Sequence, residues 1–161
     1  MKPYTRRVEE QRAGWSGGDP DDFTALTLVR TAAVMARVFV QALAPYELSP
    51  QQFSILLHLV ENPGCSQGDL ARGVLATPQS VGELLRTMQE HGLIERTAPK
   101  RRGQAFAVYA ADRGRELLDA VTPAVRAAFT PAAMGLTDDS CARLNADLHV
   151  ILAALHDGVR Q

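Results

Sequence analysis

The chain has 161 residues, of which 46% are hydrophobic and 22% charged, and its 17 basic and 18 acidic side chains give a formal net charge of −1. This length and composition fit a folded globular domain and exclude a disordered chain. The near-zero net charge gives no support for nucleic-acid binding, so such a function must rest on local clusters of basic residues.

The sequence carries no recognisable catalytic, metal or cofactor motif. Cys65 and Cys141 form no CxxC pair, and the four histidines do not group into a metal-binding pattern. Nucleophile-elbow, P-loop and dinucleotide fingerprints are absent from the sequence. We therefore expect a protein without enzyme activity, cofactor or bound metal. Its thiols should be reduced and should not act as redox sensors, because no cationic cluster adjoins either cysteine.

Residues 1–20 are expected to form a flexible N-terminal arm, because their last third is rich in glycine and proline. They show no apolar core of a signal peptide. The longest apolar stretch, residues 32–40, is short and contains Arg37, so we expect no membrane span and a cytoplasmic protein.

Residues 21–46 are expected to form an N-terminal dimerisation helix that begins at Asp21 or Asp22 and ends at Pro45. A helix that is apolar on two faces must be buried on two sides, by its own domain and by a second subunit. The two predicted stripes contain Leu26, Val29, Ala33, Ala36, Val40 and Leu43, and Leu28, Ala32, Met35 and Phe39.

Residues 47–110 are expected to hold three helices and a β-hairpin. Ser49, Ser66 and Thr77 are each placed to cap the start of a helix, and Gly92 ends the last one. The residues expected to be buried in these helices are Phe53, Leu56, Leu57, Val60, Leu70, Ala71, Val74, Val81, Leu84, Leu85 and Met88.

The hairpin is predicted from two short strand-like runs, residues 93–97 and 105–109, joined by a turn at 98–104. Four basic residues and no acidic one lie between Arg96 and Gln104. Two helices joined by a tight turn and followed by a basic hairpin are typical of a winged helix-turn-helix. In this arrangement the second helix enters the major groove and the wing contacts phosphates or the minor groove.

Residues 111–161 are expected to form C-terminal dimerisation helices. One begins near Asp112 and should be kinked at Pro123, and the last is capped by Thr137. Their apolar stripes contain Leu117, Leu118, Val121, Val125 and Phe129, and Leu144, Leu148, Ile151 and Leu155.

An ordered series of short motifs between residues 48 and 118 resembles the MarR (multiple-antibiotic-resistance regulator) family. The motifs are LSPQQF from Leu48, SQGDLA from Ser66, TPQSV from Thr77, HGLIER from His91 and RGRELL from Arg113. With the flanking helices, the resemblance extends over residues 22–157. It implies a mostly α-helical fold with a small β-hairpin, a winged helix-turn-helix between long dimerisation helices.

The resemblance further implies a homodimer that binds double-stranded DNA, with recognition helices about 34–36 Å apart on a pseudo-palindromic operator. It implies a repressor released by a small aromatic or phenolic effector. Arg86 could pair with guanine or phosphate, and Gln79 with adenine or phosphate. The recognition-helix residues are Thr77, Gln79, Ser80, Glu83 and Arg86, and the wing residues are Arg96, Lys100, Arg101, Arg102 and Gln104.

Three positions depart from the family pattern. Gly82 occupies the middle of the recognition helix, where a polar reader is usual, and it could allow close backbone approach to DNA. Glu83 stands where a basic residue is common, and it could accept a hydrogen bond from cytosine N4. The family's Asp-x-Arg of the wing falls at residues 102–104, so Lys100, Arg101 or Arg102 must supply the minor-groove cation.

Arg37 and His58 are the candidate effector-binding residues, because they lie on helices that line the family's ligand pocket. An arginine could hold a carboxylate or phenolate through two hydrogen bonds. The alternatives are an interface salt bridge for Arg37 and a structural histidine for His58. For the whole chain, the alternative to a DNA-binding regulator is a winged-helix protein-interaction module, which Glu83 and the net charge keep open.

Overall fold

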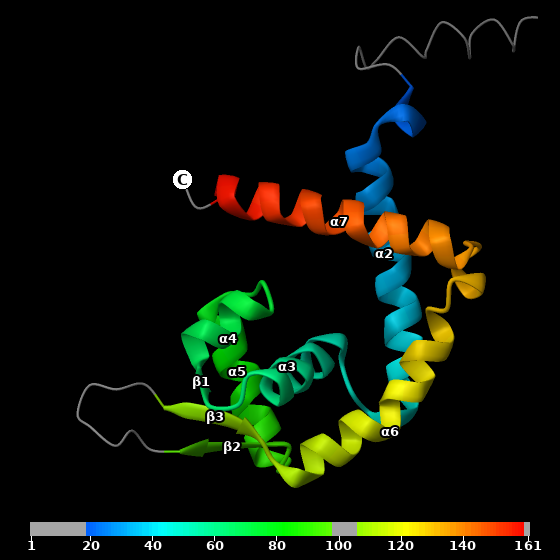
Figure 1. The fold of residues 1–161 in the computed structure, drawn as a ribbon. Coiled ribbons are helices and arrows are strands. Elements are labelled where there is room, and N and C mark those ends of the chain that lie inside the picture. Colours follow the sequence, from blue (N-terminus) through cyan, green and yellow to red (C-terminus); the bar gives the residue numbers. More distant parts are fainter. Residues whose placement is uncertain (1–18, 98–105, 160–161) are drawn as a thin grey trace, which may run out of the picture. The chain divides into compact units, whose positions relative to one another are not determined.

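The computed structural model describes residues 19–97 and 106–159, and it divides into two units, residues 1–37 and 38–161. Figure 1 shows the helices and strands as a ribbon coloured along the sequence. The predictions for the N-terminal arm and for the tip of the hairpin therefore lie outside the described residues.

The first long helix begins later than the acidic residues suggest. Pro20–Asp22 form a 3-10 turn, η1, in which the Asp19 carboxylate accepts a hydrogen bond from the Asp21 amide at 3.0 Å. The helix α2 then covers Thr24–Leu43. The predicted start at Asp21 or Asp22 is therefore wrong, because these two residues lie in the separate 3-10 turn that Asp19 caps. Arg30 in α2 reaches back to Asp21 at 3.1 Å.

By length and composition, α2 and the 3-10 turn after it, η2 (Ala44–Tyr46), are apolar enough to cross a membrane. The segment Thr24–Tyr46 has a mean hydropathy of 1.5, and 6% of its apolar window is buried inside the single chain. Sequence analysis considered only the uninterrupted run around Arg37 and did not single out this longer apolar segment.

The three helices of the middle region start where the sequence predicts. They are α3 (Pro50–Glu61), α4 (Gln67–Gly73) and α5 (Pro78–Glu90), capped by Ser49, Ser66 and Thr77. At α3, the Ser49 hydroxyl accepts from the Gln52 amide at 3.2 Å, and the Gln52 side chain accepts from the Ser49 amide at 2.9 Å. This reciprocal capping box fixes the first turn of α3.

The buried face of α3 differs from the predicted one. Ile55 and Leu59 are fully buried beside the predicted Leu56 and the largely buried Phe53. The predicted Leu57 and Val60 are instead 41% and 38% exposed. The helix is apolar on most of its circumference, so the helical period alone does not decide which side faces the core. The main core combines these residues with Leu43, Leu70, Val81, Leu85, Met88, Ile94, Val108, Leu118 and Val121.

The predicted hairpin is present in the described residues as β2 (Ile94–Thr97) paired antiparallel with β3 (Ala107–Ala110). A further strand, β1 (Cys65–Ser66), pairs with the opposite edge of β3, so the sheet order is β1-β3-β2 (Figure 1). Sequence analysis missed β1, because two residues are too few to show an alternating pattern. The helix α4 begins directly after β1. Because β1 pairs with β3, the helix-turn-helix is joined to the sheet of the wing.

The chain continues through α6 (Asp112–Ala128), the 3-10 turn η3 (Ala132–Met134) and α7 (Asp138–Val159). The helix α6 remains continuous through Pro123. The Thr137 hydroxyl accepts from the Ser140 amide at 3.2 Å, which confirms the predicted cap of α7. Of the predicted α7 stripe, Leu144, Leu148 and Leu155 are exposed and Ile151 is half-buried.

Candidate nucleic-acid interface

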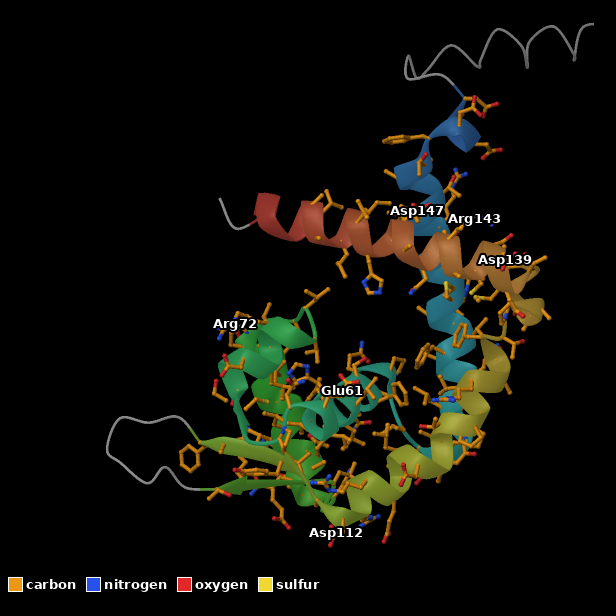
Figure 2. All side chains as sticks on the ribbon, viewed as in Figure 1. Glu61, Arg72, Asp112, Asp139, Arg143 and Asp147 are labelled. Carbon is orange, nitrogen blue, oxygen red and sulfur yellow. The ribbon has the colours of Figure 1, made fainter. Side chains whose placement is uncertain are left out.

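A tight turn joins α4 to α5 and sets the direction of the second helix. The Ala76 amide donates to the Ala71 carbonyl at 2.9 Å, and the Leu75 amide donates to the Arg72 carbonyl at 3.3 Å. The backbone of Leu75 is in the left-handed conformation, with φ of 53°, at a position that glycine usually occupies. Arg72, which projects outward from α4 in Figure 2, pairs with Asp69. Two helices and this closed turn form a helix-turn-helix.

The second helix, α5, has one buried face and one exposed face. Val81, Leu85 and Met88 are fully buried in the core. Gln79, Glu83 and Arg86 are exposed, and at 100° per residue they form a single stripe opposite the buried one. The core therefore holds α5 so that these three polar side chains face solvent together.

The predicted recognition residues differ in the hydrogen bonds that their side chains already make within the protein. Thr77 and Ser80 are engaged with each other, because the Thr77 hydroxyl accepts from the Ser80 amide at 3.2 Å and the Ser80 hydroxyl donates to the Thr77 carbonyl at 3.0 Å. Arg86 forms an exposed ion pair with Glu90 at 3.0 Å. Gln79 has no side-chain hydrogen bond to any residue that the structure describes.

An open groove lies between the start of α3 and the exposed stripe of α5. Ser80, Glu83 and Arg86 line one side of it. Pro50, Gln51 and Ser54 line the other side. The structure thus brings three of the five predicted recognition residues to one surface, next to polar groups of α3 that sequence analysis did not single out.

The described part of the wing places Arg96 toward the protein. Arg96 on β2 donates from Nη2 to Oε1 of Gln67 on α4 at 3.4 Å. Its half-buried side chain contrasts with those of its neighbours Glu95 and Thr97, which are exposed. Lys100, Arg101, Arg102 and Gln104 lie outside the described residues, so their role as DNA contacts stays a prediction.

The two candidate effector residues lie in different surroundings. Arg37 is exposed on α2. His58 on α3 is half-buried, and its imidazole packs so closely against Gly73 that a Cβ there would collide with the ring. His58 therefore contributes to the contact between α3 and α4, and a role of either residue in ligand binding stays a prediction.

Cys65 has the properties of an unreactive thiol. Burial raises its pKa above the ordinary value, the charge of Asp69 raises it further, and a backbone hydrogen bond opposes both effects. A redox sensor requires a lowered thiol pKa, because the thiolate is the reactive species. Among the described residues, no group of three histidine, cysteine or acidic side chains could hold a metal ion.

Sequence analysis missed Gln67, the first residue of α4. Its side-chain amide donates from Nε2 to the carbonyl of Pro78 in the first turn of α5 at 2.9 Å. A glycine at position 82 was the available signal, because glycine in the middle of a helix indicates that something approaches the backbone closely.

Comparisons with known proteins agree with this architecture. The sequence model described as MarR family matches residues 46–105. The HTH-type transcriptional repressor Rv2887 of Mycobacterium tuberculosis is 34% identical over 101 residues, which is 63% of this chain and 73% of that protein. A structure of the MarR family transcriptional regulator from Rhodococcus sp. RHA1 has a TM-score of 0.77 at 25% identity, covering 84% of this chain and 96% of the other.

Two structures of Rv2887 are also similar to this chain. Its complex with salicylic acid has a TM-score of 0.67 at 28% identity and covers 85% of this chain and 99% of that one. Its complex with DNA has a TM-score of 0.64 at 27% identity and covers 80% and 96%. The residues that the family model matches include α3, α4 and α5 of the helix-turn-helix. This chain belongs to the MarR family of winged helix-turn-helix transcriptional regulators.

Proposed function

We propose that the protein is a cytoplasmic homodimeric repressor that binds a pseudo-palindromic operator and is released by a small aromatic or phenolic acid. The observation that carries this proposal is the exposed stripe of Gln79, Glu83 and Arg86 on α5, beside a hairpin whose connection holds Lys100, Arg101 and Arg102. The relative Rv2887, which is named a transcriptional repressor, has been determined in complex with DNA. Regulation through DNA requires no catalysis by this chain.

Exposed apolar residues on the two terminal helices support the dimer. Val29, Val34 and Val40 on α2 are at least half exposed in the single chain. On α7, Leu148, Leu152 and Leu155 are exposed as well and lie on one side of the helix. Apolar surface of this extent on a soluble protein marks an association surface, and a second copy of the same helices offers matching chemistry.

Within this proposal, the three residues of the exposed stripe read the operator. Arg86 can pair with guanine O6 and N7 after release from Glu90, and Glu83 can accept from cytosine N4. Gln79, near the N-terminus of α5, can contact adenine or phosphate. Thr77 and Ser80 contribute mainly through the cap, which directs backbone amides of the first turn toward solvent.

The wing is tested by replacing Arg101 and Arg102 together with alanine. Operator affinity should fall roughly 10- to 100-fold, and binding to unrelated duplexes should fall in proportion, because phosphate contacts carry no sequence information. Each lost phosphate contact removes about 0.9 from the slope of log affinity against log salt, so the slope should become shallower by up to about four per dimer. Fluorescence anisotropy at several salt concentrations, with the DNA upstream of the protein's own gene, measures both quantities.

The matched control replaces two exposed arginines outside the winged helix with alanine, Arg126 on α6 and Arg143 on α7, which Figure 2 labels. It removes the same charge and should leave the slope nearly unchanged. Arg86→Ala should instead alter sequence preference. If neither the wing pair nor Arg86 affects binding, the assignment of this face to DNA is wrong.

The effector is tested on the complex of protein and operator. Salicylic acid is the first probe, because the relative Rv2887 has been determined in complex with it. We expect millimolar or lower concentrations of aromatic acids to dissociate the complex, and Arg37→Ala to raise the required concentration about tenfold if its guanidinium holds the carboxylate. Benzyl alcohol, which lacks the carboxylate, is the control ligand. Release that is equal for acid and alcohol, or unaffected by Arg37→Ala, would remove Arg37 from the site.

Acidic residues on α5 favour one alternative function, a winged-helix module that binds protein and not DNA. Glu83 and Glu90 are both exposed on this helix, and Glu90 holds Arg86. The same titration separates the two functions, since a protein-binding module would show weak duplex affinity without a steep dependence on salt.

A further inference from the structure

Gly82 lies midway along α5 at a place where another side chain already fills the space that a Cβ would need. A Cβ built on Gly82 would lie 2.8 Å from Nε2 of Gln67 and 3.8 Å from its Oε1. Gly82 itself is half-buried. The glycine in the recognition helix is therefore explained by an intramolecular contact with α4, without any need for close approach to DNA.

Gln67 joins three elements through one side chain. Its Nε2 donates to the Pro78 carbonyl at 2.9 Å, and its Oε1 accepts from Nη2 of Arg96 at 3.4 Å. The amide thus connects the start of α4 to the first turn of α5 and to β2, the first strand of the wing. Pro78 immediately precedes Gln79, the first residue of the exposed stripe.

Arg96 occupies its place at an energetic cost. Its Nε is buried and has no hydrogen-bond partner among the described residues. A buried donor without a partner is destabilising, and a side chain present only for stability would be replaced readily by an apolar one. A buried donor without a partner is expected where a functional role of the side chain outweighs the loss of stability.

We propose that Gln67, Gly82 and Arg96 form a bracket that sets the recognition helix and the wing strand in one fixed orientation for operator binding. Gln67 is the positioning residue, Gly82 gives it room, and Arg96 carries the link to β2. This inference rests on the proposed function. Base readout tolerates displacements of only about 0.5 Å, so loss of the bracket should reduce discrimination between operator and other DNA more than it reduces affinity for DNA in general.

The central test is Gly82→Ala, whose new methyl group displaces the Gln67 amide from Pro78. Alanine is the better helix former, so the urea midpoint of the variant should equal or exceed that of the wild type. Operator affinity should nevertheless fall about tenfold, as expected for loss of one well-placed hydrogen bond, while affinity for unrelated duplex and the salt slope stay unchanged. Gly68→Ala is the matched control, because a Cβ on Gly68 would lie 3.7 Å from Nη1 of Arg72, an ordinary contact distance.

The double variant Gly82→Ala with Gln67→Ala shows whether the two residues act together. Gln67→Ala alone should cause a similar loss of operator affinity, and adding Gly82→Ala should cause no further loss, because the methyl group then displaces nothing. Independent losses that add in the double variant, or wild-type operator affinity in Gly82→Ala, would overturn the proposal.

Arg96→Met distinguishes the bracket from a direct phosphate contact. Methionine keeps an apolar stem and removes the unpaired Nε, so the variant should be at least as stable as the wild type. Operator affinity should fall with the salt slope unchanged. A slope that becomes shallower by about 0.9 per subunit would show instead that Arg96 neutralises a phosphate.

A measurement without DNA keeps the inference separate from the proposed function. Amide hydrogen exchange in residues 79–83 should accelerate about tenfold in Gln67→Ala and in Gly82→Ala but not in Gly68→Ala. If the wild type bound no duplex, the proposed function would fail, and the role of the bracket in recognition would fail with it. If the wild type binds its operator and exchange is unchanged in the variants, only the bracket is wrong.

Discussion

Replacing Leu148 and Leu155 together with aspartate is expected to convert the protein into a monomer and to weaken operator binding at least 100-fold. Both leucines are exposed on the same stripe of α7, seven residues apart. Four buried carboxylates per dimer cannot be solvated or paired in an apolar interface. A dimer gains affinity because binding of one recognition helix places the other beside its half-site, an advantage of about 10²–10⁴ that a monomer loses.

Sedimentation equilibrium measures the association, and anisotropy with the full operator and with a single half-site measures the DNA affinity. The half-site should be bound almost as well by the variant as by the wild type. The control is Ala146→Asp with Ala153→Asp, which adds the same charges at the same spacing on the opposite, exposed face of α7. A variant that stays dimeric would remove α7 from the dimer interface, and a monomer that holds the full operator tightly would contradict the paired-site mechanism.

Much of the winged helix could be predicted from the sequence because its signals are local. Ser49, Ser66 and Thr77 cap helices through bonds to residues three positions ahead, and the structure confirms each of them. Such bonds depend on a few neighbouring residues, so a short motif contains the whole physical reason for them. The fold class follows from the order of these motifs.

The errors occurred where the decisive partner lies far away in the sequence. The inward side of α3 depends on where α4, β3 and α6 pack, so Ile55 and Leu59 could not be chosen over Leu57 and Val60 from the helix alone. β1 exists because β3 offers it an edge, more than 40 residues later. A strand this short has no signal of its own.

The candidate site divides in the same way. The positions of Gln79, Glu83 and Arg86 on one face follow from helical period, whereas the contact of Arg96 with Gln67 joins residues 29 positions apart. A basic residue at the base of a wing predicts a DNA contact, and only the register of β2 shows that this one turns toward α4. The chemistry of the effector and the order of bases in the operator depend on partners that one chain does not specify.

Gly114→Ala is expected to destabilise the protein by about 3 kcal/mol, toward the upper end of the range for overpacking a closed interior site. Gly114 is buried in the first turn of α6, and a Cβ there would collide with the Leu93 carbonyl oxygen and lie 2.9 Å from Cδ2 of Leu56. The Leu93 carbonyl cannot retreat freely, because it accepts the Ala111 amide at 3.0 Å. The collision can therefore be relieved only if α6 moves away from Leu93, the residue that precedes β2.

Urea unfolding at one fixed protein concentration measures the effect, because the stability of a dimer depends on concentration. The control is Gly68→Ala, another glycine in the first turn of a helix, where the added methyl group meets only ordinary contacts. It should be neutral or slightly stabilising. The comparison separates the collision from any general effect of losing a glycine.

Since α6 leads from the wing strand β3 toward the proposed dimer helices, Gly114→Ala should also weaken operator binding in protein that remains folded. Unchanged stability would mean that α6 can slide along Leu93 without cost, and the wing would then not be fixed to the rest of the protein at this contact.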